Sequence, residues 1–208
     1  MDGIHASLFE GRLICLTPVD QEKDAEIESR WTHDPGFARL AYLGPARPLS
    51  PAQVKKKYEA IEKDMEEKKN LFHMAVRTRP APGVASPDSR LVGFARLQWI
   101  EWNNGCGAVQ IGIGDQNDRH QGYGREALGL MLRYAFAELN LFRLAAIIPE
   151  YNLAALGLFQ KAGFMEEVRR RESLNRDGRR WDLLHLGILR PEWERWTHNV
   201  AAHPVGPQ

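Results

Sequence analysis

The chain has 208 residues, 43% of them hydrophobic and 26% charged, with a formal net charge of +1, as in a soluble globular protein with one core. This balance gives no reason to expect a nucleic-acid partner, and no uninterrupted apolar run approaches the ~18 residues of a membrane span. Cys15 and Cys106 lack metal-ligand spacing and the N-terminus lacks a signal-peptide pattern, so we expect a cytoplasmic protein with reduced thiols and no metal.

The first third of the chain predicts a strand followed by helices. Residues 12–16 are apolar and β-branched, and Pro18 closes the segment. Asp20 then caps a helical stretch. Ser50 followed by Pro51 is an N-cap with proline at the first helical position, which predicts a helix to about residue 69. One face of that helix is dense in lysine and glutamate, so we expect it to be solvated.

The rest of the chain alternates strands with two helices. A Pro- and Ser-rich loop is expected at 78–89, and Asn104-Gly105 indicates a hairpin turn. The remaining predicted strands are 72–76, 91–102, 109–114, 143–148, 166–174 and 181–189, and the helices are 125–136 and 152–162. We expect Pro191 to end the fold, with one domain over residues 1–196 and a flexible tail over 197–208.

The segment between the strand at 109–114 and the next helix has the composition of an anion site. Residues 119–124 have the sequence Arg-His-Gln-Gly-Tyr-Gly. The first N–H groups of a helix have no partner inside the helix, and the helix dipole adds partial positive charge there. Glycine at 122 and 124 lets a phosphate approach the backbone without meeting a Cβ atom. The segment therefore predicts a diphosphate site.

Two common nucleotide motifs do not fit this segment. A dinucleotide-binding turn needs three glycines in G-x-G-x-x-G spacing, and Gly112-Ile113-Gly114 is followed by Asp115 and two further non-glycine residues. A P-loop needs Gly-Lys-Ser/Thr, which the chain lacks. A nucleotide-binding α/β protein is therefore a minor alternative.

The same residues resemble a known acetyl-CoA motif. Arg119-x-x-Gly122-x-Gly124 is similar to the R/Q-x-x-G-x-G/A motif of the GNAT N-acetyltransferase superfamily. Residues 152–164, with the sequence Asn-x-x-Ala-x-x-Leu-Phe-x-Lys-x-Gly-Phe, resemble the second signature of that superfamily. The branch that looks most similar holds ribosomal-protein N-terminal acetyltransferases and spermidine acetyltransferases. The resemblance implies an α+β fold whose mixed, mostly antiparallel sheet is flanked by helices and splayed between its fourth and fifth strands.

The resemblance also implies how acetyl-CoA is bound. Backbone amides of the glycine turn would hold the diphosphate, and the pantetheine arm would lie along the preceding strand. A bulge at Gly112 or Gly114 would open the gap between this strand and the strand at 143–148. A strand N–H near Ile111 to Ile113 would stabilise the oxyanion, and Asn152 would bind the arm or simply cap its helix. The implied cofactor residues are Ile111, Gly112, Ile113, Arg119, His120, Gln121, Gly122, Tyr123, Gly124, Arg125, Asn152, Ala155 and Phe159.

The catalytic residues depart from the family pattern. The glutamate that many members carry early in the cofactor strand is Ala108, and the tyrosine that often protonates the leaving thiolate is Phe159. Candidates for a base or acid are Glu150, Glu101 and Tyr151, although Glu101 is better explained as an exposed hairpin charge. We interpret the strand histidines His73 and His185 as structural, and Trp31, Tyr42, Trp99 and Trp102 as core residues that could also wall a pocket.

The resulting hypothesis is an acetyl-CoA-dependent N-acetyltransferase that moves acetyl to a primary amine by direct attack in a ternary complex. A protein N-terminus, a polyamine and a small-molecule amine all stay open as acceptors. Selection among them would come from the first two helices, the loop before Ser50 and the turn at 175–178. No nucleic acid or membrane partner is expected, and a homodimer is plausible by analogy. The alternative is a non-catalytic acyl-CoA-binding sensor of the same fold.

Overall fold

A computed structural model describes residues 7–79 and 89–202, so most of the expected loop at 78–89 and residues 203–208 lie outside the described chain. The described strands form one 7-stranded sheet in the order β1-β2-β3-β4-β5-β7-β6. Every neighbouring pair is antiparallel except β4 and β5, which are parallel. The strands are β1 (Ile14–Thr17), β2 (Phe72–Thr78), β3 (Leu91–Glu101), β4 (Cys106–Ile113), β5 (Arg143–Pro149), β6 (Met165–Arg176) and β7 (Arg179–Leu189).

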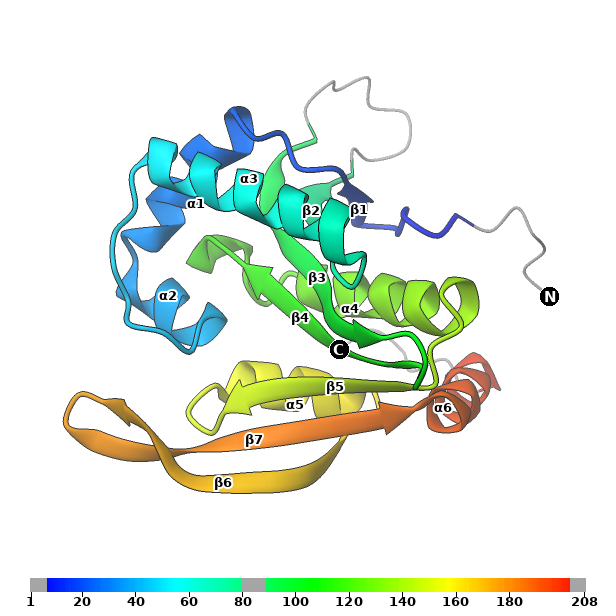
Figure 1. Ribbon diagram of the computed structural model, residues 1–208. Coiled ribbons are helices and arrows are strands. Elements are labelled where there is room, and N and C mark those ends of the chain that lie inside the picture. The colour runs from blue at the N-terminus through cyan, green and yellow to red at the C-terminus, as the bar shows by residue number, and fades with distance from the viewer. Residues whose placement is uncertain (1–6, 80–88, 203–208) are drawn as a thin grey trace.

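The helices cover both faces of this sheet (Figure 1). They are α1 (Lys23–Thr32), α2 (Pro35–Ala41), α3 (Pro51–Lys68), α4 (Tyr123–Arg133), α5 (Leu153–Lys161) and α6 (Arg190–Ala202), with a π-helical turn (Tyr134–Glu138) that extends α4. The expected mixed, mostly antiparallel sheet flanked by helices is confirmed.

Two helices were not predicted. Asp34 accepts hydrogen bonds from the amides of Gly36 and Phe37 and so caps α2, with Pro35 at its first position. This is the signal that Ser50 and Pro51 supply for α3. The prediction that Pro191 ends the fold is wrong, because proline is tolerated in the first helical turn and α6 continues through it. That helix runs six residues into the segment expected to be a tail, from 197 to 202.

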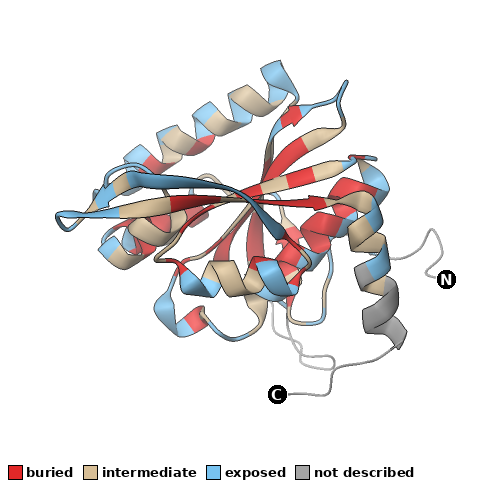
Figure 2. Cartoon of the chain, turned by 90° about the horizontal axis from the view of Figure 1, so that it is seen from below, coloured by how far each residue is buried: buried red, intermediate tan, exposed pale blue. Residues whose placement is uncertain are grey.

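The two faces of the sheet are packed differently. On the face of α4 and α5 lies the large hydrophobic core, in which Met131, Phe136, Leu144 and Leu186 are fully buried. On the face of α1, α2 and α3 the apolar clusters are smaller, and carboxylates are buried among them. Figure 2 shows the buried segments concentrated on the central strands and α4, and the exposed outer strand β6.

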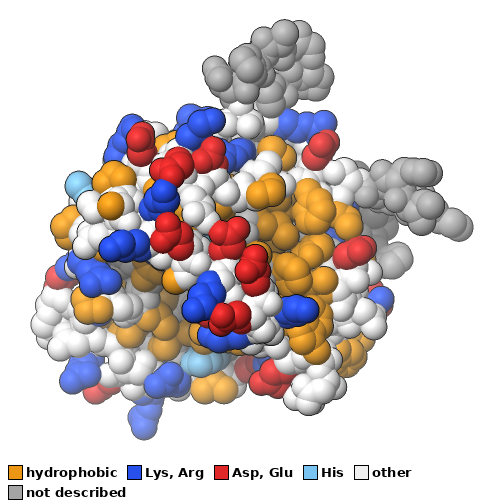
Figure 3. All heavy atoms as spheres, turned by 45° about the horizontal axis from the view of Figure 1, so that its top comes forward, with side chains coloured by type: hydrophobic (Ala, Val, Ile, Leu, Met, Phe, Trp, Pro, Cys, Tyr) orange, Lys and Arg blue, Asp and Glu red, His pale blue; other side chains and the backbone are white. Residues whose placement is uncertain are grey.

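The exposed side of α3 is solvated, as predicted. Lys63 pairs with Glu67 and Lys68 with Asp64 one helical turn apart, and all four side chains are largely exposed. On the face of the molecule seen in Figure 3, positive and negative side chains are interspersed over one part and hydrophobic side chains gather over another. Such mixed charge is typical of a solvated surface.

Candidate active site

The sheet splits between its two parallel strands. β4 and β5 pair only from Cys106 opposite Arg143 to Ala108 opposite Ala145, and the rest of each strand is unpaired at this edge. The amide of Gly114 donates to Val92 of β3 at 2.9 Å. Because hydrogen-bonding direction alternates along a strand, Ile111 and Ile113 turn their backbone groups toward the gap. The predicted splay is confirmed, and it leaves a strand edge available for pairing.

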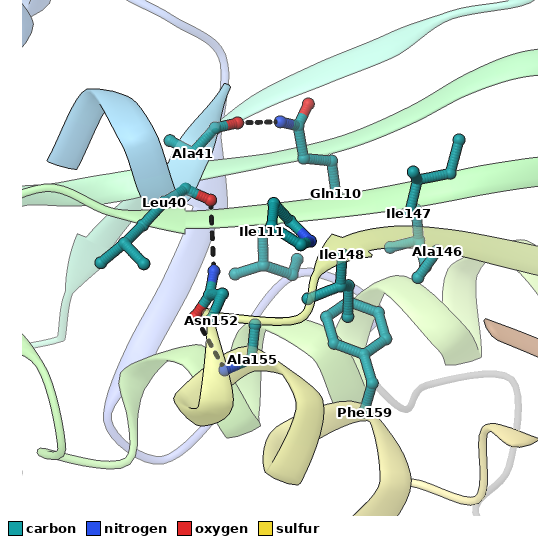
Figure 4. A pocket seen from close by; sticks show the side chains of 12 residues that line it. Leu40, Ala41, Gln110, Ile111, Ala146, Ile147, Ile148, Asn152, Ala155 and Phe159 are labelled. Atoms are coloured by element: carbon teal, nitrogen blue, oxygen red, sulfur yellow. Dashed lines mark hydrogen bonds between the residues drawn. The ribbon is translucent and has the colours of Figure 1, made fainter. Parts of the chain in front are cut away.

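A cleft opens where the strands part (Figure 4). About 370 Å³ of space in the cleft and at its open mouth is free of atoms. Its described lining comes from α2, β4, β5 and α5, and none of these described side chains can ionise near neutral pH. The lining residues are Leu40, Ala41, Val109, Gln110, Ile111, Ala146, Ile147, Ile148, Pro149, Asn152, Ala155 and Phe159.

The glycine turn lies at the start of α4. Gly122 is the N-cap residue and has a φ of 87°, and His120 before it has a φ of 62°. Within the described chain, no acceptor is bonded to the backbone N–H groups of residues 120–125, and the first helical bond runs from Glu126 to Gly122. The turn therefore presents consecutive unpaired amides at the positive end of a helix, which is the geometry of an anion site.

The two glycines of this turn have different structural requirements. Gly122 needs its left-handed backbone, and an added Cβ would lie 3.2 Å from Leu13. Gly124 lies inside the helix, where glycine is less stable than alanine by about 1 kcal/mol. A Cβ at Gly124 would meet only Ile113 and Leu158, both at an ordinary 3.7 Å. Backbone conformation therefore explains Gly122, whereas neither conformation nor packing requires glycine at position 124.

Ion pairs hold the turn against the rest of the domain. Arg119 donates to the carbonyl of Gly114 at 2.9 Å and reaches Asp34, the α2 cap, at 3.5 Å. Arg90 binds the nearly buried carboxylate of Asp118 through two bonds of 2.6 and 2.8 Å. The guanidinium of Arg119 is thus engaged with the protein itself, while Gln121, Tyr123 and Arg125 are at least partly exposed around the free amides.

The expected bulge at Gly112 or Gly114 is wrong. The register between β3 and β4 runs without a break from Gln98 opposite Ala108 to Gly93 opposite Ile113, and the irregularity lies beyond Gln98. A Cβ at Gly112 would lie 2.4 Å from the Phe94 ring, and one at Gly114 would lie 2.0 Å from Trp31. These glycines make room for aromatic rings on the α1–α3 face, and Gly112 turns its backbone toward β3.

Asn152 and Phe159 lie at the base of the cleft. The Asn152 side chain accepts from the amide of Ala155 at 3.1 Å and donates to the carbonyl of Leu40 at 3.2 Å. It caps α5 and joins that helix to α2. Phe159 is 4% exposed and packs edge-to-face on Phe164, so it closes the cleft with an apolar ring.

The three catalytic candidates lie outside the cleft lining. Glu101 is exposed, pairs with Cys106 at the closed end of the hairpin and accepts from Asn104 at 2.9 Å. Glu150 accepts from the amide of Asp182 at 2.9 Å and lies 3.6 Å from the guanidinium of Arg169.

The Tyr151 hydroxyl donates to the carbonyl of Arg39 at 3.0 Å, and its ring packs on Trp181. Each of the three side chains therefore has a structural partner in the folded chain, and none is among the residues that line the cleft.

Buried charges fill the layer between the sheet and α1–α3. Glu28, 1% exposed, accepts from Lys57 at 2.6 Å, from Tyr58 at 2.6 Å and from Tyr42 at 3.2 Å. Burial and the neighbouring Glu28 carboxylate raise the pKa of both tyrosines. The equally buried Asp24 receives two bonds from Arg77, of 2.7 and 2.8 Å.

The aromatic residues considered for a pocket wall are distributed over different environments. Trp31 is 7% exposed and packs on Phe37. Tyr42 stacks on Phe94 and joins the Glu28 network. Trp99 and Trp102 are 59% and 48% exposed at the hairpin end, away from the cleft. Core packing is therefore confirmed for Trp31 and is wrong for the two hairpin tryptophans.

Sequence reasoning missed the contribution of α2 to the site. Leu40 and Ala41, at the end of this helix, line the cleft and accept hydrogen bonds from Asn152 and Gln110. The Asp34-Pro35 capping signal could have revealed the helix, although its contact with the cleft depends on the tertiary fold.

Comparison with known proteins agrees with this architecture. The acetyltransferase (GNAT) domain family matches residues 13–165. "Probable N-acetyltransferase YjcK" of Bacillus subtilis (strain 168) is 34% identical over 141 residues, covering 66% of this chain and 69% of that protein. "Uncharacterized N-acetyltransferase p20" of Bacillus licheniformis is 22% identical over 172 residues, covering 82% of this chain and 90% of that protein.

A solved structure of spermidine N-acetyltransferase from Vibrio cholerae, in complex with CoA and spermine, superposes with a TM-score of 0.72 at 19% identity, over 87% of this chain and 98% of that one. The likeness shows the same fold. The chain belongs to the GNAT acetyltransferase family, and its class of enzyme is an acetyltransferase. No helix among the described residues is long and apolar enough to cross a membrane.

Proposed function

We propose that the chain is an acetyl-CoA-dependent N-acetyltransferase that acetylates a weakly basic α-amine by direct attack in a ternary complex. The observation that carries this proposal is the cleft between β4 and β5, which joins an unpaired strand edge to a turn of free amides. Its described lining residues include no ionisable side chain. Bound acetyl-CoA supplies the electrophilic thioester carbonyl.

The residues of the cleft fit such a cosubstrate. The free amides of residues 120–125 would bind the diphosphate at the helix N-terminus, with Gly124 leaving space for it. The backbone of Ile111 and Ile113 would pair with the amide groups of the pantetheine arm. An N–H of this strand edge would also stabilise negative charge on the reacting oxygen. Ala155 and Phe159 would contact the arm from α5.

The absence of a base among the described residues of the cleft lining favours one class of amine. An alkylamine with a pKa near 10.4 is neutral in only ~0.04% of molecules at pH 7, a cost of about 4–5 kcal/mol, whereas an α-amine with a pKa near 8 costs only about 1 kcal/mol. Without a side chain to remove the proton, this difference in deprotonation cost lowers the acetylation rate of an alkylamine relative to that of an α-amine. This argument supports an α-amine over the polyamine acceptor of the Vibrio enzyme.

Calorimetry with CoA and measurement of CoA release with matched amines test the proposal. We expect CoA binding, and faster release with a short peptide than with spermidine. With the peptide, kcat/KM should rise about tenfold per pH unit until pH ~8, where the α-amine loses its proton. Failure to bind CoA would overturn the proposal. Tight CoA binding without turnover on any amine would favour the acyl-CoA sensor.

Glu150 allows a sharper test of the mechanism. Because its carboxylate is bonded to the Asp182 amide and near Arg169, Glu150→Gln should preserve the pH profile of kcat/KM. If this variant loses activity and its profile moves to higher pH, Glu150 is the general base and the preference for a weakly basic amine is wrong.

A further inference from the structure

Three polar side chains form a row across the sheet from the cleft into the α1–α3 layer. His73 of β2 lies directly opposite Arg96 of β3, and Arg96 lies directly opposite Gln110 of β4. Directly opposite residues share a face of the sheet, and adjacent strands are about 4.8 Å apart. Gln110 lines the cleft (Figure 4), so the row begins at the cleft and extends away from it by two strand spacings.

The hydrogen bond between Arg96 and His73 determines where the histidine carries its proton. Arg96 Nε donates to His73 Nδ1 at 3.2 Å. A guanidinium can only donate, so Nδ1 is unprotonated. Burial and the charges of Arg96 and Lys57 hold the pKa of His73 well below its usual value, so the imidazole is neutral at pH 7. Its one proton is therefore on Nε2, which becomes a donor.

Two donors of this row have no acceptor in the described part of the chain. They are Nε2 of His73, whose side chain is over nine-tenths buried, and Nη2 of Arg96. A buried donor without a partner costs about 1–3 kcal/mol. No carboxylate among the described residues forms an ion pair with Arg96, and Glu28 in the same layer is bonded to Lys57.

We propose that Arg96, positioned by His73, binds a carboxylate of the amine acceptor. This inference rests on the proposed function and names its substrate class: an α-amine whose side chain ends in a carboxylate, as in a peptide beginning with Glu or Asp. A carboxylate accepts from the unpaired Nη2 of Arg96 and neutralises the guanidinium, which His73 holds in place through Nδ1. The row lies about 5–10 Å from the cleft, a separation that the side chain and backbone of one acidic residue can span. A polyamine would bring further positive charge against Arg96.

The end of α2 covers the row. The carbonyl of Ala41 accepts from Gln110 at 2.7 Å, and the next residue, Tyr42, stacks on Phe94, the ring that Arg96 also contacts. The acceptor carboxylate reaches Arg96 when this hydrogen bond opens. Gln110 then has a free amide that faces the same ligand.

Calorimetry on the full chain saturated with CoA tests the site with two tetrapeptides that differ only in an N-terminal Glu or Gln. The peptide with Glu should bind about ten- to a hundredfold more tightly, the usual effect of hydrogen bonds to a charged group. Equal affinity of the two peptides for the wild-type chain would overturn the proposal, and this comparison needs no variant that could misfold.

Substitutions then assign the preference to the row. Arg96→Gln should abolish the preference for Glu, and Arg96→Lys should retain part of it. Arg133→Gln is the matched control, because this arginine is exposed on α4 on the opposite face of the sheet, and it should retain the full preference. A folded Arg96→Gln chain that still prefers the peptide with Glu would contradict the assignment.

Turnover with acetyl-CoA separates this proposal from the proposed function. Preferential binding of the Glu peptide without CoA release would support the carboxylate site and overturn the acetyltransferase proposal. Equal kcat/KM for the two peptides, with measurable CoA release, would support acetyl transfer and overturn the carboxylate site.

Discussion

The two faces of the sheet are packed with different kinds of side chain. The α4–α5 face is an apolar core whose largest side chains are fully buried, and it packs the helix that begins at the glycine turn against the sheet. The α1–α3 face has small apolar clusters separated by buried charges, among them Glu28, Asp24 and the Arg96–His73 pair.

This difference indicates which face of the sheet can select the acceptor. Apolar packing is not directional, so the α4–α5 face supplies a rigid support that would serve any acceptor. A buried charge requires a particular partner, and an incomplete set of hydrogen bonds favours a ligand that completes it. We therefore expect substitutions on the two faces to separate cofactor binding from acceptor choice.

The largest expected effect is on the stability of the charged face. Glu28→Ala removes the acceptor for Lys57, Tyr42 and Tyr58 and should lower the free energy of unfolding by about 3 kcal/mol. This value is at the lower end of the range for a broken buried ion pair, because the partly exposed Lys57 can turn to water. Urea unfolding measures the change. Glu59→Ala on the exposed side of α3 is the control, expected within about 0.5 kcal/mol of wild type. Equal losses of unfolding free energy in the Glu28 and Glu59 variants would show that the buried carboxylate does not contribute more to stability than an exposed one.

The next largest expected effect is a loss of CoA affinity from a substitution in the glycine turn. Gly124→Glu places a bulky negative side chain where we expect the diphosphate, so CoA affinity measured by calorimetry should fall at least a hundredfold, about 2.7 kcal/mol. The fold should keep its stability, since glutamate favours a helix and its first turn.

Gly129→Glu is the matched control for that change. Gly129 is exposed on the same helix, and an added Cβ would meet nothing within 4 Å. It should leave CoA affinity unchanged. Normal CoA binding by the Gly124 variant would contradict the proposed position of the diphosphate.

A smaller effect should appear as the pH falls. The pKa of His73 is depressed in the folded chain, whereas in the unfolded chain it is near 6.5, so the unfolded state binds more protons below neutral pH. The contribution of neutral His73 to the free energy of unfolding is therefore full at pH 7.5. Below pH ~6.5 it falls by up to about 1.4 kcal/mol per pH unit.

Chemical denaturation at pH 7.5 and 5.5 compares wild type with His73→Gln. The groups that face His73 are Arg96, Lys57 and the rings of Tyr58 and Phe94. The variant should lose less stability than wild type on acidification, by about 1 kcal/mol. The same loss in both would show that His73 titrates normally.

The smallest effect is expected at the rim of the charged face. Arg39 binds Asp177 through two bonds of 2.8 and 2.9 Å, which tie the β6–β7 turn to α2. The pair is exposed, so Asp177→Asn should cost no more than about 1 kcal/mol. We expect a few-fold higher KM for the acceptor with unchanged CoA affinity, measured by steady-state kinetics. An equal loss of CoA affinity would place this turn on the cofactor side.

Local sequence determined the elements and the motif turn. Apolar and β-branched segments predicted the strands, and Asn104-Gly105 predicted the hairpin. Gly122 before a helix predicted the turn whose amides are free in the structure. These features depend on residues adjacent in the chain. The prediction failed at α6, where Pro191 was interpreted as the end of the fold although proline fits the first helical turn.

Tertiary structure alone decided the partners of the charged and catalytic candidates. Glu126, in the first turn of α4, accepts from the amides of Arg12, Leu13 and Ile14, more than a hundred residues earlier. The same is true of Glu150 with Asp182 and of His73 with Arg96, because strand register brings these pairs together. A charged side chain in a sequence has no fixed acceptor, and only the packed sheet determines which donors are satisfied and which remain for a ligand.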